Sequence, residues 1–134
     1  MSHTIQNIKL IIWDLDGTFW DGVLSEGEVK VPEDRVKFIE DLTDCGIMQS
    51  VCSKNDLAAA KARLEEAGAW EMFVFPSISW ESKGPRIKGI LQEMSLRAED
   101  TLYIDDNPSN RGEARFYAPG INVAGPEVLS ELMR

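Results

Sequence analysis

The sequence has a single histidine, His3, and only two cysteines, Cys45 and Cys52. A lone histidine close to the N-terminus argues against Ser-His-Asp and Cys-His catalysis and against a zinc site built from histidines. Two cysteines without a CxxC motif do not make a disulfide framework, so we expect the reduced thiols of a cytoplasmic protein. Any catalysis by this chain would therefore depend on carboxylates, lysine, hydroxyl groups and a bound metal.

Long apolar runs and an excess of basic residues are also missing. The longest apolar run, residues 10–13, is too short to span a bilayer, and no basic segment followed by a long apolar stretch marks a signal peptide. Lysine and arginine number 14 against 23 acidic residues, for a net charge of −9, which disfavours nucleic acid and anionic membranes as partners. We expect a cytoplasmic protein that binds anionic substrates through a divalent cation.

The 134 residues fit one compact domain, with neither internal repeats nor low-complexity linkers. Short β-branched runs predict strands, and apolar residues at helical spacing predict helices. Strands are expected over residues 8–13, 47–52, 72–75, 101–104 and 121–124, helices over 33–45, 57–67, 82–94, 109–117 and 127–133, and a hairpin-like flap over 19–31. This alternation predicts an α/β fold with a parallel sheet of about five strands, in which the residues that follow the strands converge on one edge.

Asp14 and Asp16 follow the first predicted strand and precede Gly17 and Thr18. Residues two apart in an extended segment point the same way, and two carboxylates about 4 Å apart repel by about 4 kcal/mol at an effective dielectric constant of about 20. A cation or a shared proton compensates for such repulsion. A pair of solvated turn aspartates is the alternative interpretation.

A second acidic pair, Asp105 and Asp106, follows the strand predicted over residues 101–104. Together with Asp14 and Asp16 it would form a pocket of oxygen ligands, and Mg²⁺ prefers carboxylate, carbonyl and water oxygens. One aspartate of this later pair could instead cap the helix that follows.

Lys83 and Ser53 add a cation and a hydroxyl group. Lys83 begins a predicted helix, where a cation opposes the helix dipole, and this misfit suggests a role in phosphate binding; an exposed surface lysine is the alternative. Ser53 lies between a strand and a helix, where its hydroxyl and the nearby N–H groups suit a phosphate oxygen. Its spacing to Asp56 is also that of a helix cap.

These motifs resemble those of a known superfamily. The segment at residues 14–18 (DLDGT), followed in order by Ser53, Lys83, Asp105 and Asp106, is similar to the four motifs of the haloacid dehalogenase (HAD) superfamily of phosphotransferases. The likeness covers about residues 8–110. The resemblance implies a three-layer, Rossmann-like α/β fold, and the short flap implies that no cap domain is present.

A closer likeness is to the FkbH-like branch, subfamily IIIC, and it rests on residues 13–24, 52–55 and 104–108. Gly17 departs from this branch, which often has Asn at that position. The resemblance implies one HAD-like catalytic domain over residues 1–134, of a kind that many relatives carry as part of a longer polypeptide.

The resemblance also implies the role of each site residue. Asp14 would attack phosphorus and form an aspartyl-phosphate, and Asp16 would act as acid and base. Ser53 and Lys83 would bind phosphoryl oxygens, and Thr18 would position the loop. The ligands of Mg²⁺ would be Asp14, the main-chain carbonyl of Asp16, Asp105 and, directly or through water, Asp106.

The expected function is hydrolysis of a small phosphorylated metabolite, with Trp20 and Val23 of the flap as candidate substrate contacts. The FkbH-like branch is associated with glyceryl transfer to an acyl carrier protein, so a carrier-loading transferase is the alternative, and an adjacent domain or partner could cover the site. For that alternative Cys52 could carry a thioester, or it could be a plain buried cysteine. A third hypothesis is a non-catalytic phosphoacceptor or regulatory module, which would have little use for the acid and base offered by Asp16.

Overall fold

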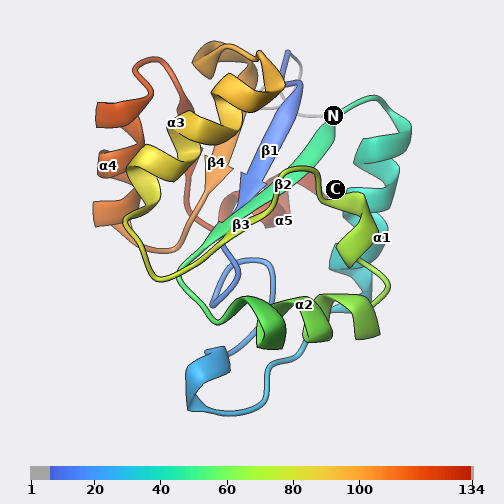
Figure 1. Cartoon of the computed structure of the whole chain (residues 1–134). Helices are drawn as coiled ribbons and strands as arrows, with labels where there is room; N and C mark the ends of the chain where they lie inside the picture. The colour runs from blue at the N-terminus through green and yellow to red at the C-terminus, as the bar shows by residue number, and fades with distance from the viewer. Residues whose placement is uncertain (1–6, 134) are drawn as a thin grey trace.

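The computed structural model describes residues 7–133, so His3 lies outside the described part of the chain. Five parallel strands form one sheet in the order β3-β2-β1-β4-β5, and five helices alternate with them (Figure 1). The strands are β1 (Leu10–Trp13), β2 (Met48–Ser53), β3 (Ser77–Ile78), β4 (Thr101–Ile104) and β5 (Asn122–Ala124). The helices are α1 (Glu33–Asp44), α2 (Leu57–Glu66), α3 (Lys83–Met94), α4 (Pro108–Tyr117) and α5 (Val128–Leu132). The predicted α/β fold with a parallel sheet is confirmed.

Helices cover both faces of the sheet because side chains alternate along each strand. In β1, Leu10 and Ile12 pack with residues of α3 and α4, whereas Ile11 and Trp13 pack with residues of α1, α2 and α5. Figure 1 shows α3 and α4 on one side of the sheet and α1 on the other. A central strand that is buried on both faces must be apolar throughout, which explains the unbroken apolar run of β1. The layers are therefore helix, sheet and helix.

The helices are short and end at recognisable signals. α1 and α3 have 12 residues each. α1 begins after Pro32 and is followed by Gly46, whose φ of 91° lies in the left-handed region that favours glycine. Among residues 7–133, no helix has both the length and the apolar character needed to cross a membrane.

The prediction of a third strand over residues 72–75 is wrong. Within that segment only Phe73 pairs, through one isolated bridge to Gln49. Phe75 has a φ of 47°, which is not an extended conformation, and a proline follows it, so the chain turns before it runs alongside β2. The strand forms two residues later, at Ser77–Ile78, and occupies the edge of the sheet.

A short flap connects β1 to α1. Asp21 and Lys30 pair in the antiparallel sense, with N–H···O distances of 2.9 and 3.0 Å, and a 3-10 turn at Leu24–Glu26 lies between them. The predicted hairpin-like flap is thus confirmed. A connection of this length holds no cap domain, as the sequence predicts.

Asp100, directly before β4, ties that strand to the start of β1. Its main-chain oxygen accepts a hydrogen bond of 2.7 Å from the N–H of Lys9. Its carboxylate accepts two bonds of 3.0 Å from the guanidinium of Arg97. Hydrogen bonds from Arg97 hold the pKa of Asp100 below its ordinary value, against the opposing effect of burial.

We expect Asp100→Asn to destabilise the protein at neutral pH and to weaken the dependence of its stability on acid. The pKa of this carboxyl is lower in the folded state than its unfolded value of about 3.9, so its charge stabilises the fold above that value and the effect is lost as the pH falls through the folded pKa. Urea unfolding from about pH 7 to about pH 2 measures this difference. Equal pH dependence in variant and wild type would contradict it, and Asp41→Asn, on the exposed surface of α1, is the control.

Candidate active site

The predicted site residues lie at one edge of the sheet. Asp14 follows β1, Ser53 ends β2 and Asp105 follows β4, and these three strands are neighbours in the sheet. All the strands run parallel, so their carboxyl ends share an edge, which the flap and α2 border in Figure 1. Lys83 joins them as the first residue of α3. Residues from four separate segments thus meet in one place.

Lys83 lies between two carboxylates. Its Nζ atom is 2.8 Å from Oδ1 of Asp14 and 2.8 Å from Oδ2 of Asp105. The residue is only 3% exposed, which rules out its interpretation as an exposed surface lysine. Burial alone would lower the pKa of Lys83, but Asp14 and Asp105 raise it above its ordinary value. The ammonium group therefore stays charged.

The carboxyl groups on either side of Lys83 have pKa values shifted in opposite directions. Burial raises the pKa of Asp14 to about 7, and the charges of Asp105 and Asp106 act in the same direction while Lys83 opposes them. Burial also acts to raise the pKa of Asp105, but the charge and hydrogen bond of Lys83 hold it below the ordinary value. Lys83 therefore stabilises the charged form of Asp105 enough to outweigh burial, but does not do so for Asp14.

Asp105 is held by several donors besides the lysine. The Tyr103 hydroxyl and the side-chain amide of Asn110, at 3.2 Å, donate to Oδ2, and the N–H of Asn107 donates to Oδ1 at 2.8 Å. Neither Tyr103 nor Asn110 follows from the sequence motifs. Asn107, not an aspartate, caps α4, since its side-chain oxygen accepts a bond of 2.8 Å from the N–H of Ser109 in the first turn of that helix. The capping role considered for the acidic pair is therefore wrong.

Thr18 connects the loop after β1 to the loop after β4. Its hydroxyl donates to Oδ2 of Asp14 at 3.3 Å and accepts a bond of 3.2 Å from the N–H of Asp106. The preceding Gly17 has a φ of 70°, and a Cβ atom there would lie 2.7 Å from a carboxylate oxygen of Asp106. Glycine thus meets both the backbone and the space requirements of this turn. The placement of Thr18 is consistent with the loop-positioning role expected for it.

The carboxylate of Asp16 is turned toward the flap. It accepts bonds from the indole N–H of Trp20 at 2.9 Å, the N–H of Leu24 at 3.0 Å and the amide of Asn55 at 3.1 Å. These three bonds fix the orientation of the Asp16 carboxylate, and the metal-binding and proton-transfer roles expected for Asp16 stay predictions. Of the two flap residues named as substrate contacts, Trp20 is fully buried and Val23 is 38% exposed.

Ser53 does not cap α2. The cap is Asp56, whose carboxylate accepts a bond of 2.9 Å from the N–H of Ala59. The Ser53 hydroxyl instead accepts a bond of 3.0 Å from the amide of Asn55, the same amide that binds Asp16. Asn55 is buried and links two proposed site residues, a role that sequence analysis misses. The only sequence signal for it is its place just after a strand.

Three of the carboxylates could share a metal ion. Asp14, Asp105 and Asp106 each offer one oxygen, and these oxygens all lie within 4.8 Å of one another. A set of carboxylate oxygens without nitrogen or sulfur is the set that Mg²⁺ prefers. The cluster therefore fits the predicted cofactor.

Cys52 lies beneath the site and is not a nucleophile in this arrangement. Its thiol is fully buried and lies 3.8 Å from the main-chain oxygen of Lys83. Burial raises the pKa of Cys52 to about 11, so the reactive thiolate is scarce at neutral pH. The interpretation of Cys52 as a buried, inert cysteine is supported, and a thioester on this residue is not.

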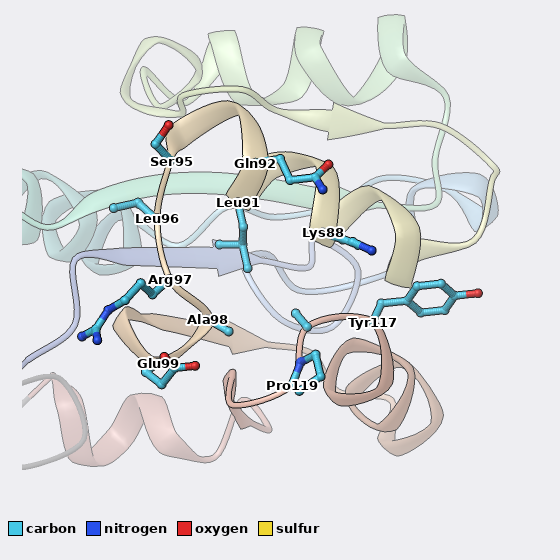
Figure 2. A pocket seen from close by; sticks show the side chains of 11 residues that line it. Lys88, Leu91, Gln92, Ser95, Leu96, Arg97, Ala98, Glu99, Tyr117 and Pro119 are labelled. Carbon is cyan, nitrogen blue, oxygen red and sulfur yellow. The ribbon is translucent and has the colours of Figure 1, made fainter.

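The hollow between α3 and α4 is separate from the carboxylate cluster. It has a volume of about 450 Å³, and Figure 2 shows Leu91 and Lys88 of α3 at its walls, with Tyr117 at the end of α4 and Pro119 just after that helix. None of the four aspartates and neither Ser53 nor Lys83 lines it. It is therefore not part of the candidate active site.

We expect only one thiol of the native protein to react readily with a disulfide reagent. Cys45 is exposed and Cys52 is buried, and at about pH 8 a thiol of pKa about 11 is only about 0.1% ionised. Titration with Ellman's reagent should give one fast thiol in the native protein and two after unfolding. Cys45→Ser should abolish the fast phase, and a fast phase that persists in this variant would contradict the burial of Cys52.

Comparison with known proteins adds to this picture. No protein-family model matches the chain, and no curated protein matches its sequence. Among solved structures, the N-terminal part of a Bacteroides fragilis protein, which contains a phosphatase domain complexed with Mg, is 25% identical with a TM-score of 0.79. The match covers 94% of this chain but only 39% of that structure.

Two further solved structures share the fold. The cobalt-bound deoxy-D-mannose-octulosonate 8-phosphate phosphatase of Haemophilus influenzae is 24% identical, with a TM-score of 0.71 over 92% of this chain and 71% of its own. A candidate HAD superfamily, subfamily IIIA, hydrolase of Legionella pneumophila is 20% identical, with a TM-score of 0.69 over 95% of this chain and 71% of its own. The chain therefore has the Rossmann-like fold of HAD superfamily phosphatases, and the likeness to these three structures does not confirm the FkbH-like branch.

Proposed function

We propose that the chain is a Mg²⁺-dependent phosphatase that acts on a small phosphorylated metabolite through an aspartyl-phosphate on Asp14. The observation that carries the proposal is the buried Asp14 carboxylate, bound to Lys83 and grouped with Asp105 and Asp106 at the carboxyl ends of the strands. The magnesium-complexed phosphatase domain that resembles this chain supports the same activity.

The first half of the reaction uses Asp14 and Asp16. The Asp14 carboxylate attacks phosphorus, the bond from phosphorus to the leaving oxygen breaks, and Asp16 gives that oxygen a proton. In the second half, a water molecule attacks the phosphorus of the aspartyl-phosphate and passes its proton to Asp16. The bond from phosphorus to the Asp14 oxygen breaks, which frees inorganic phosphate and restores the Asp14 carboxylate. The three hydrogen bonds on Asp16 support this role because they fix the orientation of its carboxylate.

Ser53 and Lys83 are the proposed ligands of the transferring phosphoryl group. Lys83 supplies a fixed positive charge beside the nucleophile, and the Ser53 hydroxyl supplies a hydrogen-bond donor from the adjacent strand. Donors that are already in place stabilise the charge that develops in the transition state without a cost of reorganisation. The ordered hydrogen bond between Ser53 and Asn55 is consistent with such preorganisation.

Asp14, Asp105, Asp106 and the main-chain carbonyl of Asp16 would hold Mg²⁺. The bound ion neutralises charge on the phosphoryl group and orients it. Without it, three carboxylates face one ammonium group, an excess of negative charge that would repel a phosphate ester. The arrangement thus favours a cation together with the substrate.

No contact among residues 7–133 favours the two other hypotheses. A carrier-loading transferase stays a prediction. Cys52 was the candidate thioester site for that function, and its burial argues against this role. A phosphoacceptor module would retain phosphate on Asp14 instead of releasing it. Turnover beyond one phosphate per protein therefore separates the phosphatase from the module, and a mass gain on an added acyl carrier protein identifies the transferase.

We expect Asp14→Asn to abolish phosphate release. An amide is a poor nucleophile, so the rate should fall by about three orders of magnitude or more. The measurement is Mg²⁺-dependent release of phosphate from a panel of phosphorylated metabolites, with EDTA as the metal-free comparison. Asp41→Asn, a change on the exposed surface of α1, is the matched control. Equal rates for wild type and Asp14→Asn on every substrate would sink the proposal.

Asp16→Asn should impair substrates with poor leaving groups most. The amide oxygen still accepts bonds from Trp20 and from the N–H of Leu24, but it cannot donate a proton to the leaving oxygen. We expect a loss of about a hundredfold to ten-thousandfold on alkyl phosphates and a smaller loss on p-nitrophenyl phosphate, whose leaving group needs no proton. The ratio of the two rates in wild type and variant tests this. An equal loss on both substrates contradicts an acid role for Asp16.

A further inference from the structure

Arg86 is the most heavily bonded side chain near the site, although none of the sequence motifs includes it. It lies in the first turn of α3, three residues after Lys83. Its guanidinium donates to main-chain oxygens from two separate segments. The acceptors are Ser53 at 3.2 and 3.3 Å, Ser77 at 2.8 Å, Ser79 at 3.2 Å, Glu81 at 2.7 Å and Ser82 at 3.3 Å. One side chain thus gathers five carbonyl groups.

The segment that Arg86 binds has little else to hold it. β3 has only two residues, and it pairs with β2 only at Cys52 and Ser53. Ser82, which precedes α3, makes no side-chain cap. Buried and half-buried carbonyl groups need donors, and an arginine offers five N–H groups in one rigid plane. Hydrogen bonds from a charged donor are stronger than those between neutral groups.

The carbonyls bound by Arg86 belong to the segments that carry the two proposed phosphoryl ligands. The Ser53 oxygen accepts from Arg86 and also from the N–H of Ser79, at 3.2 Å. Glu81 lies two residues before Lys83, and its oxygen is bound at 2.7 Å. Ser53 and Lys83 are 30 positions apart in the sequence, and the guanidinium binds the backbone of Ser53 and that of the residues just before Lys83 at the same time. The Ser79 N–H and the Cys52 thiol add one contact each between these segments.

We propose that Arg86 is a positioning residue that fixes the Ser53 hydroxyl and the Lys83 ammonium relative to each other. This inference rests on the proposed function, in which those two groups bind the transferring phosphoryl group. Arg86 does not touch the substrate, because its N–H groups are directed to main-chain oxygens. A lysine can replace it only in part, since an ammonium group presents three donors at one point and cannot reach all these carbonyls.

The test compares Arg86→Ala and Arg86→Lys with wild type. Misplacing the phosphoryl ligands should lower kcat by about a hundredfold in Arg86→Ala and weaken inhibition by inorganic phosphate, with a smaller loss in Arg86→Lys. Guanidinium ion added at concentrations far below denaturing should restore part of the activity of Arg86→Ala and none to Asp14→Asn. Arg63→Lys, an arginine on α2 bonded to Glu66, is the matched control.

The outcomes separate this inference from the proposed function. An active wild type with an Arg86→Ala variant of unchanged kcat and phosphate inhibition overturns the positioning role alone. A wild type that binds phosphate with Mg²⁺ but never turns over refutes the phosphatase, and phosphate affinity in the variants then decides the role of Arg86. A wild type that neither binds nor releases phosphate overturns both. If Arg86→Ala unfolds, judged by thermal melting, Arg86→Lys provides the comparison.

Discussion

The rest of the site depends on the ion pairs that the Lys83 ammonium group makes with Asp14 and Asp105. Burying a charge is costly unless it is paired, and removing one partner of a buried pair costs about 3–5 kcal/mol. This pairing draws α3 onto the ends of β1 and β4 and fixes both carboxylates. It does not neutralise them, because Asp106 adds a third carboxylate. Burial raises the pKa of Asp14, and the charges of Asp105 and Asp106 act in the same direction. The excess of carboxylates over the single ammonium group favours a divalent cation.

Loops at the ends of parallel strands expose carbonyl groups, and in this chain arginines from three helices bind them. Arg35 of α1 donates to the main-chain oxygen of Thr18 at 2.6 Å, and Arg111 of α4 donates to that of Asp105 at 2.7 Å. Arg86 of α3 does the same for the loops after β2 and β3. Each loop is thereby fixed to a helix that is packed on the sheet. The proposed metal and phosphoryl sites would both need ligands held in place to fractions of an ångström, and these hydrogen bonds hold the loops that carry them.

Hydrophobic patterning predicts most of the fold, because a strand buried on both faces and an amphipathic helix leave strong local signals. It fails at residues 72–75, where the apolar run packs as a turn and the real edge strand is only two residues long. The site residues likewise divide into those that a local sequence pattern marks and those that it does not. Aspartates just after strands were predictable, since parallel strands converge at one edge. Asn55 and Arg86 were not, because each acts through contacts with a distant segment that no local pattern records. Tyr103 contacts Asp105 only two residues away, but the sequence motifs do not include it.

The hydrogen bonds of Asp16 join the proposed acid and base to the flap. Its carboxylate accepts bonds from Trp20 and from the N–H of Leu24, both in the flap, and from Asn55, two residues after the end of β2. Any movement of the flap must therefore either carry Asp16 with it or break these bonds. A flap that contacts the substrate would then set the orientation of the proton donor at the same time. Under the proposed mechanism, this coupling would let the flap influence both substrate binding and the chemical step.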